Sequence, residues 1–229
     1  MSFPTVGLIA SEWAQGIYQF EGRKLGIGIK FSSNARTADE LIEFAKDCDI
    51  LCIDPEMVEN SAVKTAERAG VRVYPSSKTL EQLESIEKNL ISGECISILI
   101  ARSAHNQASS WPITLITDNL TITPLPGISD QQARDIQVSA LNLASEIGLI
   151  GGFELLVDAS DHKKLISINW LAPKAKFWTQ INSTSNYFEQ NLRAMLETMG
   201  YTIVPYTYSK PITPIRDEDM AEEETTYKF

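Results

Sequence analysis

The sequence contains little cysteine, little histidine and no long apolar run. Its 229 residues include three cysteines and two histidines, and 30 acidic residues against 20 basic ones give a net charge of −10. No apolar stretch approaches the ~18 residues that a membrane helix needs, and residues 1–10 lack the basic start and long apolar core of a signal peptide. We therefore expect a soluble, cytoplasmic protein with no membrane partner. The negative charge argues against a nucleic-acid partner.

The residues that most often serve as metal ligands or nucleophiles are scattered along the chain. Cys48 and Cys52 are not followed by a second cysteine or histidine pair, and an odd number of cysteines does not predict a disulfide framework. We expect Cys48, Cys52 and Cys95 to be buried core thiols. His105 and His162 lie far apart, and neither accompanies a nucleophile motif.

Residues 1–90 alternate apolar runs with helical patterns, in a chain that is 43% apolar and 22% charged. This composition is typical of a globular protein. A capping box at Thr37–Glu40 predicts one helix start. The expected strands are Val6–Ile9, Leu25–Phe31, Ile50–Ile53 and Val71–Tyr74. Strands separated by helices indicate parallel pairing through right-handed crossovers, and so an α/β, Rossmann-like unit.

The pattern changes in residues 91–205. A second capping box, Ser129–Gln132, begins a helix that ends at Gly148, and Asn186–Met199 is a further expected helix. The expected strands are Glu94–Arg102, Trp111–Asp118, Leu149–Val157 and Leu165–Leu171. Strands that cluster with few helices between them predict an α+β domain with a mainly antiparallel sheet.

Residues 206–229 contain prolines followed by a dense acidic run. Six of the eight residues in Asp217–Glu224 are acidic. We expect this segment to be a solvated acidic tail, and docking of a partner is the alternative.

Several segments in the second half resemble a known family. These are Asn169–Lys174 (NWLAPK), Phe177–Thr179 (FWT) and Thr184–Ala194 (TSNYFEQNLRA), and they resemble the carboxy-terminal signature of carboxyaminoimidazole ribonucleotide synthetase (PurK). This synthetase is the ATPase subunit of phosphoribosylaminoimidazole carboxylase, in the ATP-grasp superfamily. Upstream, Ile150–Val157 and Ser97–Ser103 are similar to two of its strands, and the match covers most of residues 5–200. The resemblance implies a pre-ATP-grasp unit before an ATP-grasp domain, a homodimer, and ATP-dependent carboxylation of aminoimidazole ribonucleotide.

The sequence departs from the family where the nucleotide would be held. The family carries a lid domain, with lysines and a glycine-rich loop, before the strand that corresponds to Ser97–Ser103. Here Asn89 is followed almost at once by Glu94–Arg102, and Gly93 is the single glycine in the gap. Phosphoryl transfer depends mainly on positioning and charge neutralisation, so a triphosphate would lack its cationic clamp. The family's glycine-rich opening also reads Ala10–Ala14 (ASEWA) here.

The resemblance further implies a magnesium site made of two carboxylates and an amide oxygen. Glu154 and Asn169 occupy two of these positions, and the third is Trp170, whose indole has no acceptor for a cation. An ion pair of Glu154 with Lys174 or Lys176 is the alternative. Asn169 would then satisfy backbone groups at the strand end.

Aromatic and basic residues surround these positions. Phe177, Trp178 and Trp170 are expected to fill the space of the nucleotide and lid, rather than to stack on a base. Three cations, Lys174, Lys176 and Arg102, form a candidate anion site.

Two hypotheses about function stay open. In the first, the chain is a degenerate, non-catalytic relative that needs no cofactor and binds a protein partner or a small anionic metabolite. In the second, it carries out the carboxylation with Mg²⁺ and ATP.

Overall fold

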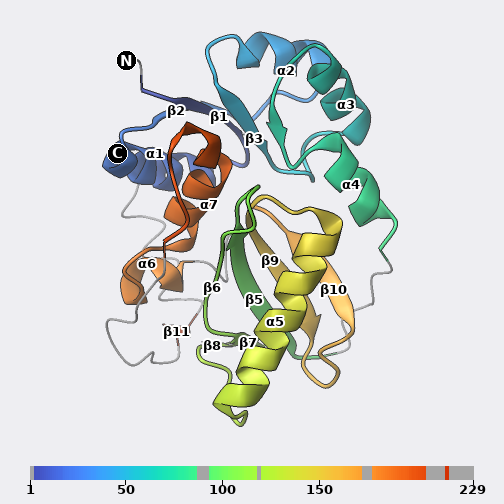
Figure 1. Ribbon diagram of the computed structural model, residues 1–229, viewed down its shortest axis with the longest axis vertical. Helices are drawn as coiled ribbons and strands as arrows, with labels where there is room; N and C mark the ends of the chain where they lie inside the picture. Colours follow the sequence, from blue (N-terminus) through green and yellow to red (C-terminus); the bar gives the residue numbers. More distant parts are fainter. Residues whose placement is uncertain (1–2, 87–92, 118–119, 172–176, 205–214, 217–229) are drawn as a thin grey trace.

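A computed structural model describes residues 3–86, 93–117, 120–171, 177–204 and 215–216. Two sheets, one from each half of the chain, lie one above the other (Figure 1). No helix among the described residues is long and apolar enough to span a membrane. The two sheets correspond to the two sequence patterns on either side of residue 90.

The first sheet is parallel, in the strand order β2-β1-β3-β4. Its strands are β1 (Thr5–Ile9), β2 (Gly28–Ser32), β3 (Ile50–Ile53) and β4 (Val73–Tyr74). Its helices are α1 (Trp13–Leu25), α2 (Ala38–Ala45), α3 (Asn60–Arg68) and α4 (Ser77–Glu84). The strict alternation of strand and helix confirms the predicted Rossmann-like unit.

Local capping explains where these helices begin and end. The capping box at Thr37 is present, because the Thr37 side chain accepts from Glu40 N and the Glu40 carboxylate accepts from Thr37 N. Ser76 caps helix α4, because its side chain accepts from Thr79 N. Gly26 ends α1 in the left-handed conformation, with φ of 70°.

The second sheet has seven strands, with the path β10-β9-β5-β7-β8-β11 and with β6 paired to β5. All of its recorded pairings are antiparallel, as predicted. The strands are β5 (Cys95–Arg102), β6 (Ala108–Ser110), β7 (Thr114–Ile116), β8 (Leu120–Ile122), β9 (Gly151–Asp158), β10 (Leu165–Asn169) and β11 (Ile215–Arg216).

Two features of this sheet differ from the expectation. Strand β6 was not predicted, because Ala108–Ser110 is too short and polar to show an alternating pattern. Strand β11 lies within residues 206–229, which we expected to be a solvated tail, and its backbone pairs with β8. The acidic run Asp217–Glu224 lies outside the described residues.

Four helical segments complete the second half: α5 (Asp130–Ile147), α6 (Trp178–Asn182), α7 (Tyr187–Met195) and the 3₁₀ turn η2 (Glu197–Met199). Helix α5 begins at the predicted Ser129 capping box and ends at Gly148. The predicted helix Asn186–Met199 is split, because α7 ends at Met195 before η2 begins. Helix α7 contacts β5 and β9 of the second sheet and α1 of the first, so it joins the two halves (Figure 1).

The apolar core continues from one sheet to the other. All eight residues of β5 are buried, so this strand is covered on both faces. The cysteine prediction is confirmed for Cys52 and Cys95, which are buried free thiols, while Cys48 is half-buried. Burial raises the pKa of Cys52 to about 12, so this thiol stays protonated and unreactive at neutral pH.

Candidate functional site

The structure brings Glu154 and Asn169 together, as the resemblance implies. They are directly opposite each other in the antiparallel pairing of β9 with β10. The Asn169 amide donates to the second carboxylate oxygen of Glu154, Nδ2 to Oε2, over 3.2 Å. Two of the expected magnesium ligands are therefore adjacent, although the amide presents its nitrogen to Glu154.

The other oxygen of Glu154 is occupied as well. Ser97 on β5 donates its hydroxyl to Glu154 Oε1 over 2.5 Å. Ser97 has no exposed surface, and Glu154 is 3% exposed. This buried carboxylate therefore accepts one hydrogen bond on each oxygen from its own sheet, which offsets part of the cost of burying it.

Trp170 follows β10 and faces away from the Glu154 carboxylate. Its ring packs against Phe153, with centroids 6.3 Å apart. Phe153 and Glu154 are neighbours on β9, and successive side chains on a strand point to opposite faces. The Trp170 indole thus packs on the opposite face of the sheet from the carboxylate. It is 4% exposed and forms part of the core, and its filling of the space of the nucleotide and lid stays a prediction.

Arg102, a predicted anion ligand, lies at the carboxyl end of α5. Its guanidinium donates from Nη1 to Leu149 O over 2.8 Å and from Nη2 to Ser145 Oγ over 3.3 Å. Asn106 also accepts from it. Burial lowers the pKa of Arg102. A cation placed beside the last carbonyls of a helix stabilises that helix, and a role of Arg102 in anion binding stays a prediction.

Lys174 and Lys176 lie outside the described residues, so their expected proximity to Arg102 or Glu154 stays a prediction. Among the residues that the structure describes, no three histidine, cysteine or acidic side chains gather as a metal site would require.

The family signature in α7 forms a buried polar junction between the two halves. The Asn191 amide donates from Nδ2 to Tyr18 Oη over 2.5 Å, and its oxygen accepts from Gly152 N over 2.6 Å. Asn186 Nδ2 donates to Glu21 Oε1 over 2.7 Å. Each of these side chains is at most 6% exposed. The signature segment in α7 therefore forms hydrogen bonds with both α1 of the first half and β9 of the second.

The sequence analysis did not identify the residues on either side of this junction. Tyr18 and Asn191 are 173 positions apart, and no local sequence pattern predicts their contact. The glycine at position 152 reflects this close packing, because a Cβ there would lie 2.9 Å from Asn191 Cβ and from a Tyr187 ring carbon. Burial raises the pKa of both Tyr18 and Tyr187 well above its usual range, so both hydroxyls stay protonated.

Trp13, the first residue of α1, lies in the segment that the resemblance aligns with a glycine-rich opening. Trp13 packs edge to face against Phe177 and Phe188, with ring centroids 5.9 and 6.4 Å away. Aromatic pairs of this kind bury large apolar areas. Close approach of a ligand along the backbone, which glycines would allow, is replaced here by side-chain packing.

A pocket of about 540 Å³ lies where α2 and α3 begin, beyond the carboxyl ends of the first sheet. Backbone N–H groups at the start of α2, from Arg36 and Thr37, already donate to the Glu40 carboxylate. At the start of α3, Glu59 accepts from the Ser61 hydroxyl. The N–H groups at the start of α2 thus already bind a carboxylate, and Glu59 places a second carboxylate at the start of α3, so both disfavour a small anionic metabolite in this pocket.

Comparisons with known proteins point to one kind of relative. No protein-family model matches the chain. The N5-carboxyaminoimidazole ribonucleotide synthase of Mycobacterium leprae is 30% identical over 149 residues, which are 62% of this chain and 33% of that protein. The Mycobacterium tuberculosis synthase is 34% identical over 109 residues, which are 44% of this chain and 25% of that protein. The chain thus spans a third or less of the length of these relatives.

Solved structures show the same fold. The N5-carboxyaminoimidazole synthetase of Staphylococcus aureus, complexed with ADP, has a TM-score of 0.75 at 14% identity, covering 99% of this chain and 87% of that one. The Thermotoga maritima synthetase has a TM-score of 0.73 at 13% identity, covering 93% and 79%. The chain is thus a relative, in sequence and in fold, of the N5-carboxyaminoimidazole ribonucleotide synthases, which are ATP-grasp proteins of purine biosynthesis.

Proposed function

We propose that this protein is a non-catalytic relative of the synthases, which acts by binding a partner and not by transferring phosphate. The observation that carries the proposal is the state of Glu154. Ser97 and Asn169 donate to its two oxygens, and the side chain is buried. Magnesium prefers near-ideal octahedral oxygen ligation and gives up its waters reluctantly, so a buried carboxylate in this state is a poor site for it.

The short connection between the halves supports the same proposal. Residues 85–94 are all that separates α4 from β5, which is far too short for a folded lid domain. A linker of this length cannot fold into a lid over a triphosphate, whose transfer depends on positioning and charge neutralisation. We therefore expect the protein to work without Mg²⁺, ATP or another cofactor.

Catalysis of the carboxylation itself is the competing hypothesis. The names of the relatives favour it, as does the adjacency of Glu154 and Asn169. A coupled assay for ADP release, with Mg-ATP, bicarbonate and aminoimidazole ribonucleotide, decides between the two. Release at the rate of a buffer blank supports the binding role, and release that depends on the ribonucleotide refutes it. Sedimentation in the same buffer would show whether the homodimer that the resemblance implies is present.

Replacing Trp170 with glutamate should not restore ATP turnover. The new carboxylate would point toward Phe153, on the face of the sheet opposite Glu154, and the lid would still be missing. We expect ADP release by Trp170→Glu to stay at background. Trp170→Phe, which keeps an apolar ring, is the matched control. Magnesium-dependent ADP release by the glutamate variant alone would show that the site lacks one ligand and nothing more.

A further inference from the structure

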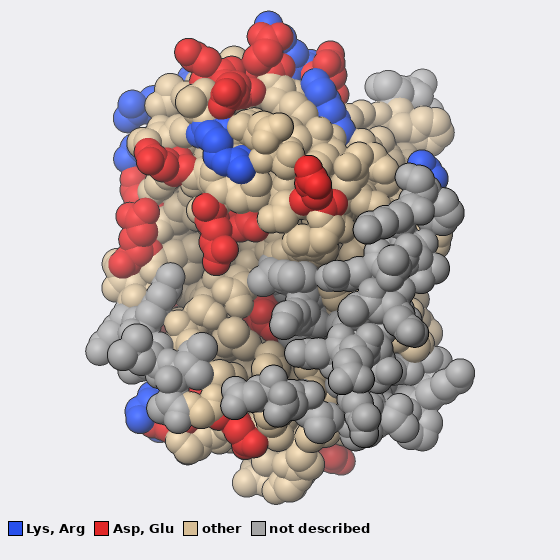
Figure 2. All heavy atoms as spheres, turned by 180° about the vertical axis from the view of Figure 1, so that it is seen from behind, with Lys and Arg blue, Asp and Glu red and all other residues tan. Residues whose placement is uncertain are grey.

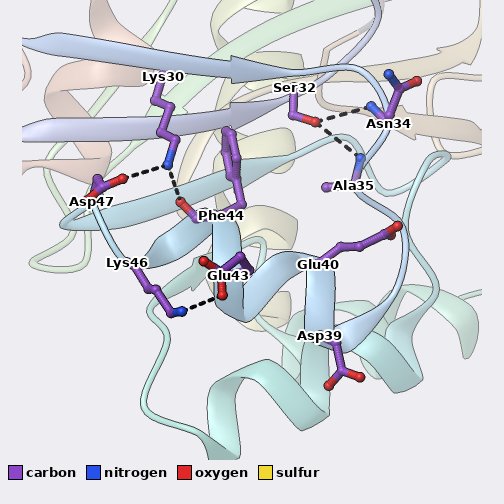
Figure 3. A pocket seen from close by; sticks show the side chains of 10 residues that line it. All are labelled: Lys30, Ser32, Asn34, Ala35, Asp39, Glu40, Glu43, Phe44, Lys46 and Asp47. Atoms are coloured by element: carbon purple, nitrogen blue, oxygen red, sulfur yellow. Dashed lines mark hydrogen bonds and ion pairs between the residues drawn. The ribbon is translucent and has the colours of Figure 1, made fainter.

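The edge strand β2 has an open face beside α2 (Figure 3). A groove of about 810 Å³ runs between them. Lys30 and Ser32 of β2 line one side, and Asp39, Glu43 and Phe44 of α2 line the other. In the helix-covered sheets of this fold class a strand face is normally packed, so the open face of β2 is available for a contact.

The outer edge of β2, along the same groove, has no neighbouring strand among the described residues. Gly28 donates to Pro4 O over 2.8 Å and Ser32 O accepts from Ala10 N over 3.2 Å, so these residues turn their backbone groups toward β1. Alternation along the strand directs the backbone N–H and C=O of Ile29 and Phe31 to the outer edge. Because β2 ends the sheet, no described strand pairs with them. Such an edge is a template for another strand.

The residues that line the groove carry more negative than positive charge. The two ammonium groups are already neutralised, since Lys30 bonds Asp47 over 3.0 Å and Lys46 bonds Glu43. Glu40 stays ionised, because the N–H groups of Thr37 and Arg36 lower its pKa. No described cation pairs with Asp39. Because Lys46 balances Glu43, the negative charge of the α2 wall comes from Asp39 and Glu40, in a protein that is acidic overall. Acidic side chains (red) are spread over the upper half from behind as well (Figure 2).

We propose that β2 and this groove bind an extended segment of a partner protein, with basic residues at every second position. A strand added to β2 would place alternate side chains on the face of Lys30, beside Asp39 and Glu40 of the α2 wall. Its other side chains would lie on the face of Ile29, which packs on Gly22 of α1, and would be apolar. A second copy of this chain is disfavoured, because two acidic grooves would repel each other.

The inference rests on the proposed binding role, and it is tested separately from ATP turnover. The probe is a short capped peptide that alternates lysine and valine, titrated into the full chain by fluorescence anisotropy. We expect saturable binding that weakens with added salt, together with slower amide exchange at Ile29 and Phe31. A peptide of alternating glutamate and valine should not bind. A lysine peptide methylated on alternate backbone nitrogens should bind far more weakly, since it cannot pair with the strand.

Two double variants with the same change in net charge locate the site. Asp39→Lys/Glu43→Lys should weaken binding of the lysine peptide by about tenfold, and Glu12→Lys/Glu84→Lys, away from the groove, by less than about threefold. Circular dichroism checks that both variants are folded. Equal weakening would indicate a general charge effect and overturn the proposal. Undiminished binding by the methylated peptide, exchange protection confined to β10, or no binding at all would overturn it too.

Discussion

Replacing Asn191 with alanine should lower the free energy of unfolding by about 3 to 5 kcal/mol. The change removes the two hydrogen bonds of Asn191 and leaves the buried hydroxyl of Tyr18 and the buried N–H of Gly152 without this partner. Each such group costs roughly 1 to 3 kcal/mol, and the cavity adds to that. Urea unfolding monitored by tryptophan fluorescence measures the effect.

A matched variant separates the hydrogen bonds from the packing. Tyr18→Phe removes one partner and keeps the ring against Phe188, whose centroid is 5.6 Å away, so it should cost only about 1 kcal/mol. The double variant should cost less than the sum of the two single ones, because the same bond is removed in each. A cost below about 1 kcal/mol for Asn191→Ala would show that the junction does not stabilise the fold.

Replacing Glu154 with alanine should lower stability by about 2 to 4 kcal/mol, while Glu154→Gln should change it by less than about 1 kcal/mol. Alanine leaves Ser97 and Asn169 without their acceptor. Glutamine accepts from Asn169 and donates to the Ser97 hydroxyl, which can rotate to accept. It keeps both bonds and buries no charge. Thermal unfolding of the three proteins measures this.

Magnesium provides the control for a functional role of Glu154. If the carboxylate serves the fold, as we expect, millimolar MgCl₂ leaves the melting temperatures of the wild type and of Glu154→Gln equally unchanged. Stabilisation of the wild type that Glu154→Gln abolishes would contradict this account and identify Glu154 as a metal ligand.

Local signals in the sequence were enough for most of the fold. The capping boxes at Thr37 and Ser129 place the starts of α2 and α5, and Gly148 places the end of α5. These signals work because their partners lie within one helical turn. The split of the last helix at Leu196 was not foreseen, since apolar spacing continues through the 3₁₀ turn that follows.

Long-range contacts account for what the sequence could not show at the candidate site. The resemblance identified Glu154 and Asn169 as adjacent, and the pairing of β9 with β10 confirms that. The hydroxyl that donates to the Glu154 carboxylate belongs to Ser97, which is 57 positions away in the sequence. The orientation of Trp170 is likewise not visible in the local sequence, because its ring packs against Phe153 on the neighbouring strand.

Binding of Mg-ATP tests the central claim most directly. A ligand present at a hundred times its dissociation constant should stabilise the folded state by ~2.7 kcal/mol. We predict that millimolar Mg-ATP leaves the melting temperature of the full chain unchanged, with no ADP formed during the incubation. A clear rise in melting temperature together with ADP release would contradict the loss of catalysis and restore the synthase reaction as the function.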